Sequence, residues 1–132
     1  MPVHELGQII AAADRAIEVE DFDSVVDFYD DAATLVIRPG LNVSGKLAIR
    51  QAFAAIAEHF NHSLRIEQDR IAVVEGGDTA LVIAEAILTT TAANGGTTTV
   101  ARRSTYVFRR DERRGWLCLI DNSYGSDLLV GA

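Results

Sequence analysis

The chain has 132 residues, of which 48% are hydrophobic and 23% are charged, and its formal net charge is −7 at pH 7. This length suits one domain with a core of its own, and the apolar content excludes a disordered chain. The negative charge repels phosphate groups, so we expect neither a nucleic acid nor a membrane as a partner.

The N-terminus and the potential metal ligands set further limits. The first residues lack the basic segment and apolar core of a signal peptide, and no stretch is long and apolar enough to span a bilayer. We therefore expect a soluble, cytoplasmic protein. Cys118 is the single cysteine, and His4, His59 and His62 show no metal-binding pattern, so we expect no metal and no cofactor.

Three helices are predicted in the first half of the chain. The first covers about residues 2–20, the second is short and capped by Asp21, and the third covers about 45–61 with Ser44 as its N-cap. Their apolar stripes at helical spacing are Leu6, Ile9, Ile10, Ala13 and Ile17; Phe22, Val25, Val26 and Tyr29; and Ile49, Phe53, Ile56 and Phe60.

The second half of the chain is predicted to be strands. Residues 64–74, 79–91, 98–110 and 116–123 are rich in β-branched and aromatic residues, and glycine-containing turns separate them. A further strand, 33–38, ends at Pro39-Gly40. Short connections make the four later strands an antiparallel meander, and strands of this length twist and curl around the helices. The sequence therefore predicts one α+β domain over residues 1–132, with three N-terminal helices packed on a strongly curved, mostly antiparallel sheet.

The whole pattern resembles the nuclear transport factor 2-like superfamily, which includes SnoaL-like polyketide cyclases and ketosteroid isomerase, and within it the small SgcJ/EcaC-type proteins. The residues that carry this resemblance are Tyr29 to Ala32, Pro39, Gly45, Ile49, Arg103 to Arg110, Gly115-Trp116 and Asp121 to Ser123. The resemblance covers about residues 4–126. It implies a cone-shaped fold with a pocket between the helices and the concave sheet face, and a homodimer through the opposite face. Many relatives carry a histidine where this chain has Asn122, so the proton carrier of those relatives is missing here.

Glu85 is one candidate for a catalytic base, because aliphatic strand residues surround it. A buried carboxylate without a partner would have a raised pKa. The alternative, which we favour, is an ion pair with Arg102 or Arg103. Alternation makes one of these two arginines point inward, where it could hold a ligand carboxylate or neutralise Glu85. Arg103 is our ligand-binding candidate.

The last strand offers Asp121 as a second catalytic candidate. Strict alternation places Trp116 and Asn122 on one face and Asp121 on the other. If Trp116 faces the pocket, Asn122 lines it too and Asp121 points away. His59, which borders the apolar stripe of the third helix, is the third candidate.

The helix stripes should face the concave side of the sheet. We therefore expect one cavity to be approached by Tyr29, Phe53, Ile56, Trp116 and Asn122.

Two functions agree with this pattern. The first is a pocket for a small apolar organic ligand, which would be an isomerase or a polyketide-cyclase-like enzyme if it is catalytic. The alternative is a non-catalytic, dimeric assembly module with a filled pocket. Because the strands are apolar on both faces, a homodimer is expected in either case.

Overall fold

The computed structural model describes residues 4–129, and its elements follow the predicted order of helices and then long strands. The helices are α1 (Glu5–Glu18), α2 (Phe22–Asp27) and α3 (Lys46–His59), followed near the C-terminus by the 3-10 helix η1 (Gly125–Leu129). The strands are β1 (Tyr29–Arg38), β2 (Leu41–Ser44), β3 (Arg65–Gly76), β4 (Thr79–Thr91), β5 (Thr97–Asp111) and β6 (Gly115–Asn122).

Helix α1 packs its apolar stripe against the sheet. His4 caps the helix, because its Nδ1 accepts a hydrogen bond from the backbone N–H of Leu6 at 3.0 Å. Leu6 and Ile10 are almost fully buried. The predicted start of this helix at Pro2 lies outside the described residues.

Helix α2 is shorter than its apolar pattern suggests. Asp21 caps it through Ser24, whose backbone N–H and hydroxyl both donate to the aspartate side chain. The helix ends at Asp27, and Tyr29 opens strand β1 instead of continuing the helical stripe. That part of the helix prediction is wrong, because pairing with β6 extends the chain from Tyr29 onwards.

Helix α3 begins after a glycine rather than after a serine cap. Ser44 belongs to the short strand β2, and Gly45 precedes the helix with a φ of +88° and no side-chain hydrogen bond. A residue with a side chain would be strained at this φ, which explains the glycine. The serine cap was therefore wrongly predicted.

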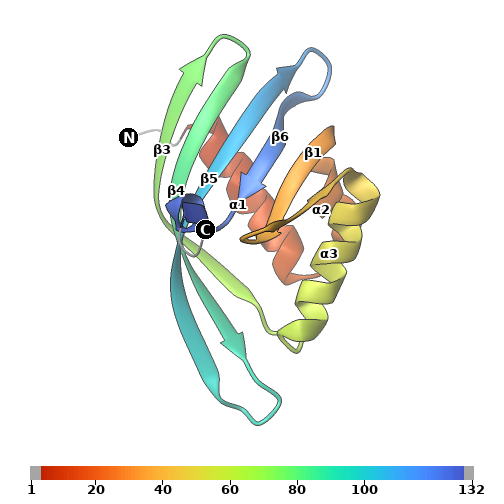
Figure 1. Cartoon of the computed structure of the whole chain (residues 1–132), viewed down its shortest axis with the longest axis vertical. Coiled ribbons are helices and arrows are strands. Elements are labelled where there is room, and N and C mark those ends of the chain that lie inside the picture. Colours follow the sequence, from red (N-terminus) through yellow and green to blue (C-terminus); the bar gives the residue numbers. More distant parts are fainter. Residues whose placement is uncertain (1–3, 130–132) are drawn as a thin grey trace.

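The sheet has six strands in the order β2-β1-β6-β5-β4-β3. Strands β3 to β6 form the predicted antiparallel meander, while β1 pairs with β6 in parallel and with β2 in antiparallel orientation. Helices α1 to α3 lie over one face of the sheet, and the β4–β5 hairpin extends beyond them at the lower end of the view (Figure 1). The α+β cone fold is confirmed.

The strand pairing shifts at four places in the sheet, and two of these shifts lie in β3 and β6. In β3 the pairing with β4 shifts between Gln68 and Arg70. In β6 the pairing with β5 passes from Cys118 to Ile120 and omits Leu119. An extra residue of this kind bends the strand and reverses which residues face inward beyond it.

None of the described helices has the length and apolar character needed to cross a membrane.

Candidate functional site

A cavity of about 680 Å³ lies between the helices and the concave face of the sheet. Its walls are mostly apolar, as in sites for small organic molecules. The ionisable side chains that line it are Asp14, Arg38, His59, Arg102, Tyr106, Asp121 and Tyr124.

Asp121 is a buried carboxylate in this cavity. The hydroxyl of Tyr29 donates a hydrogen bond of 2.5 Å to its Oδ2 atom. Burial raises the pKa of Asp121 from 3.8 to about 6, although the hydrogen bond from Tyr29 works in the opposite direction. Tyr29 is only 1% exposed and does not line the cavity. It therefore orients Asp121 from the core side, away from the cavity.

Asp14 is a second buried carboxylate in the same cavity. It lies on α1 and accepts a hydrogen bond of 2.7 Å from Nε2 of Gln68 on β3. Burial raises the pKa of Asp14 to about 7, and the charge of Asp121 contributes to the rise. Oε1 of Gln68 is buried and has no hydrogen-bond partner among the described residues.

Tyr106 lines the cavity within the electrostatic reach of both carboxylates. It pairs with Asp121 across β5 and β6. Burial raises the pKa of the Tyr106 hydroxyl well above its ordinary value, and Asp121 and then Asp14 raise it further. The hydroxyl therefore stays protonated and can donate to an oxygen on a ligand. Asp14, Tyr106 and Asp121, which we call the acid cluster, are among the polar residues of this mostly apolar wall.

The bulge at Leu119 explains why Asp121 faces the cavity. Trp116 and Cys118 face the core before the bulge, and Asp121 takes the inward position after it. Alternation without a bulge predicted the opposite, and that prediction is wrong.

Contrary to our expectation, Asn122 does not line the cavity. Its amide Nδ2 donates to the hydroxyl of Thr105 and to the carbonyl of Gly125, both at 3.1 Å. Its Oδ1 accepts a hydrogen bond from the backbone N–H of Tyr124. Asn122 therefore holds the turn that places Tyr124 at the cavity.

Trp116 is not in the cavity wall either. It is buried in the core, and the guanidinium of Arg110 lies 4.3 Å from its ring centroid. It shares the inner face with Asp121 but lies at the other end of β6, so its expected contact with a ligand is not supported.

Glu85 and Arg103 lie on the outer face of the sheet. Arg70 and Arg103 both form ion pairs with Glu85, and their hydrogen bonds, Arg70 first, lower the pKa of this carboxylate. Glu85 is therefore no pocket acid. The inward arginine is Arg102, not Arg103, because Arg102 shares its face of β5 with Ser104 and Tyr106.

Besides Asp121, three candidate residues of the sequence analysis line the cavity, all from α3. Phe53 and Ile56 form part of its apolar wall, and His59 lies at the end of the helix. His59 is exposed, and its ring packs edge-on against Phe60 at 4.8 Å. No hydrogen bond joins it to the acid cluster among the described residues.

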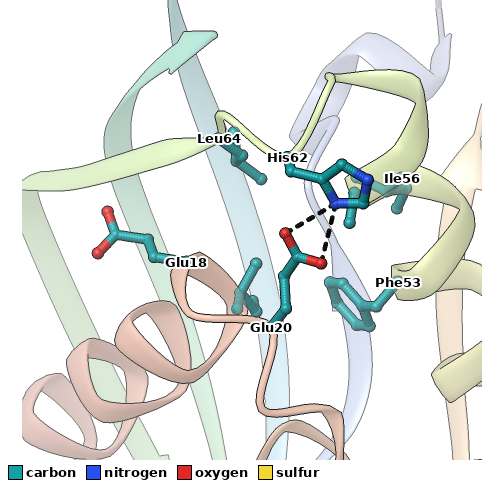
Figure 2. Close-up of a pocket in the computed structure, with 8 residues that line it drawn as sticks. Glu18, Glu20, Phe53, Ile56, His62 and Leu64 are labelled. Carbon is teal, nitrogen blue, oxygen red and sulfur yellow. Dashed lines mark hydrogen bonds and ion pairs between the residues drawn. The ribbon is translucent and has the colours of Figure 1, made fainter.

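A small side recess of about 10 Å³ adjoins the main cavity. Ile17, Phe53, Ile56 and Leu64 line both spaces. Figure 2 shows that Glu20 and His62 meet across this recess, where Nδ1 of His62 lies 2.9 Å from Oε2 of Glu20. Both residues have a positive φ, near 60°, so the backbone at this rim is strained.

Within residues 4–129, no group of three or more potential ligands is arranged to hold a metal ion.

A family model described as a SnoaL-like domain matches residues 6–118. The chain therefore belongs to the SnoaL-like family, as its sequence pattern indicated. It shares its fold with solved structures described as NTF2-like. A comparison with curated proteins finds no match.

Solved structures with the same fold share little sequence with this chain. Aln2 from a Streptomyces species is 22% identical, with a TM-score of 0.81 over 98% of this chain and 97% of Aln2. A candidate dehydratase of the NTF2-like family from Streptomyces avermitilis is 21% identical, with a TM-score of 0.75 over 89% of this chain and 90% of its own. The association domain of CaMKII from C. elegans is 17% identical, with a TM-score of 0.70 over 89% of this chain and 90% of its own. At these identities the similarity shows the fold alone.

Proposed function

We propose that this protein is an enzyme that moves a proton next to the carbonyl group of a largely apolar organic molecule, as isomerases and polyketide cyclases do. The observation that carries the proposal is the pair of buried aspartates in an apolar cavity. Two carboxyls whose pKa values differ can divide the roles of acid and base. One structural neighbour is named as a candidate dehydratase, a class of reaction that also depends on proton transfer.

Asp121 is the base in this proposal. Its pKa of about 6 leaves it ionised at neutral pH, and Tyr29 fixes its orientation. It takes a proton from the carbon beside the carbonyl, and the electron pair of that C–H bond moves to the carbonyl oxygen to give an enolate. Tyr106 and protonated Asp14 donate hydrogen bonds to the enolate oxygen. Return of the proton to another carbon completes an isomerisation.

The test is hydrogen–deuterium exchange at the carbon next to the carbonyl of 2-tetralone, a two-ring ketone, followed by NMR in D2O. The wild-type protein should accelerate exchange, and Asp121→Asn should lower the rate by about 100-fold or more, the usual contribution of a general base. Glu85→Gln is the matched control, because it removes a carboxylate from the outer face, and its rate per folded molecule should equal that of the wild type. Exchange that Asp121→Asn leaves unchanged would contradict the assignment.

The exchange rate should also depend on pH in a bell-shaped way. It should rise through about pH 6 as Asp121 loses its proton, and fall above about pH 7 as Asp14 loses the proton that it donates. A rate that keeps rising through pH 9 would remove Asp14 from the mechanism.

We also propose that the outer sheet face forms a two-fold homodimer. Four apolar residues lie in one row across four strands, and each is at least partly exposed: Val74, Leu81, Val107 and Ile120. Ile83, which is 42% exposed, extends this patch. Monomers rarely expose so much continuous apolar surface. One neighbour of the same fold is named as an association domain.

The dimer should lose its interface when a charge is placed in the patch. We expect the wild type to have the mass of two chains in light scattering at micromolar concentration, with more than about 1,000 Å² buried. Ile83→Glu should have the mass of one chain. Leu47→Glu, which changes an equally apolar but 71% exposed residue on α3, should remain dimeric. A wild-type protein with the mass of one chain would refute the proposal.

A further inference from the structure

Arg102 is the arginine of β5 that faces the cavity. It lies opposite Ala86 on β4, which in turn lies opposite Gln68 on β3, and all three residues line the cavity. Tyr106 follows it by four positions along the strand, which corresponds to about 13 Å between their Cα atoms. Tyr106 and its cross-strand partner Asp121 therefore lie at a different position along this wall from Arg102, whereas Asp14 is held by Gln68 in the row of Arg102.

The guanidinium of Arg102 is held in place but has no carboxylate partner among the described residues. It lies 4.7 Å from the ring centroid of Tyr124, whose backbone is fixed by Asn122. The other arginines of β5 each form an ion pair: Arg103 with Glu85, Arg109 with Asp30 and Arg110 with Glu75. In a chain with a net charge of −7, a cavity arginine without an acidic partner is available to a ligand.

The cavity is lined by both acidic and basic side chains. Asp14 and Asp121 carry its negative charge, whereas Arg38, His59 and Arg102 supply its cationic or protonatable side chains. An anionic group placed beside the two aspartates would be repelled. The same group beside Arg102 would meet a planar donor fork that matches the geometry of a carboxylate.

We infer that the ligand of this cavity is an aromatic or alicyclic acid: an apolar body with a carboxylate at the end away from the reacting carbonyl, bound by Arg102. This inference rests on the proposed function for the position of the carbonyl end. Arg102 is then a specificity-determining residue, and Tyr124 is the residue that positions it.

The test compares two fluorescent probes that differ only in the carboxylate, 6-hydroxy-2-naphthoate and 2-naphthol, by titration at pH 7. Both carry a hydroxyl that the acid cluster can bind. The wild type should bind the naphthoate at least about tenfold more tightly, which is the contribution of a charge-assisted hydrogen bond. Arg102→Gln should abolish this preference. Arg103→Gln, which changes the neighbouring arginine on the outer face, should keep it.

Each result separates this inference from the catalytic proposal. Equal affinity for the two probes, binding of neither, or a preference that survives Arg102→Gln overturns the inference. If this happens while proton exchange still depends on Asp121, the catalytic proposal stands alone. A preference that needs Arg102 in a protein without exchange activity supports the inference and contradicts the catalytic proposal instead.

Discussion

Asp14→Asn is expected to raise the free energy of unfolding by about 4 kcal/mol at pH 8, and by almost nothing near pH 3.5. The pKa of Asp14 is about 7 in the folded protein, against an ordinary value of 3.8. Each unit of difference is worth about 1.4 kcal/mol, so burying the ionised form costs about 4 kcal/mol. An asparagine has no charge to bury, and its amide oxygen can still accept the hydrogen bond from Gln68.

The pH window follows from the direction of the shift. Below about pH 3.8 both the folded and the unfolded chain carry the proton, and Asp14 costs nothing. Between about pH 3.8 and 7 the unfolded chain loses the proton first, so the wild type becomes less stable relative to the variant as the pH rises. Above about pH 7 both states are ionised and the difference is constant.

Urea unfolding of both proteins at pH 3.5, 5, 7 and 8.5 measures this effect. Asp27→Asn is the control, because Asp27 is exposed on α2 and its replacement should change little at any pH. A gain of the same size at every pH would show that packing, and not the charge of Asp14, is responsible. No gain at pH 8.5 would show that Asp14 is well solvated.

A carboxylate that lowers the stability of its own fold is typical of a functional site. Asp14 and Asp121 are both buried, and neither forms an ion pair among the described residues. By contrast, Asp30 and Glu85 are paired with arginines. A backbone hydrogen bond and then an arginine lower the pKa of Asp30, and two arginines lower the pKa of Glu85. Asp30 and Glu85 therefore have arginine partners, whereas the two aspartates in the cavity have no cationic partner among the described residues.

The fold was predictable because its signals are periodic. Apolar stripes predicted α1 and α3, and the turns between strands predicted the meander. The apolar pattern also carried the second helix too far, to Tyr29, because a hydrophobic residue at a helix end fits a helix and a buried strand equally well. Tyr29 is extended because β1 pairs in parallel with β6. That pairing is a long-range contact, which a local pattern does not show.

Asp14 left a signal in the sequence that we did not use. It follows Ile10 by four positions and precedes Ile17 by three, so it lies within the apolar stripe of α1. An aspartate in such a stripe is rarely buried without a reason. The same reasoning singled out Glu85, but Glu85 lies on the outer face of the sheet. The inference failed there because both faces of this sheet are apolar, so the sequence does not show which face is inside.

The position of Asp121 could not be derived from alternation, because one inserted residue decides it. Leu119 is omitted from the pairing of β5 with β6, and no glycine or proline marks the place. Alternation counted from Trp116 therefore assigned Asp121 and Asn122 to the wrong faces of the sheet. The choice between Arg102 and Arg103 stayed open for a similar reason, since it depends on which face of β5 Tyr106 occupies.

Tyr29→Phe is expected to destabilise the protein by about 1.5–3 kcal/mol at pH 8, the contribution of a hydrogen bond to a charged group. The ring contacts of Tyr29 with Phe28 and Phe53 remain, so the change isolates the hydroxyl. Without this donor the pKa of Asp121 should rise above about 6, because the hydrogen bond from Tyr29 is what opposes the effect of burial. The loss of stability should therefore shrink toward pH 4, where Asp121 is protonated in both variant and wild type.

The same substitution should move the acidic limb of the exchange profile to higher pH, because Asp121 would need a higher pH to lose its proton. This shift distinguishes an orienting role of Tyr29 from a purely structural one, which would lower stability and leave the limb in place. In the Asp121→Asn background Tyr29→Phe should cost less, since a neutral amide accepts a weaker hydrogen bond than a carboxylate. Equal costs in the two backgrounds at pH 8, together with an unmoved limb, would show that the hydrogen bond of 2.5 Å does not control the charge of Asp121.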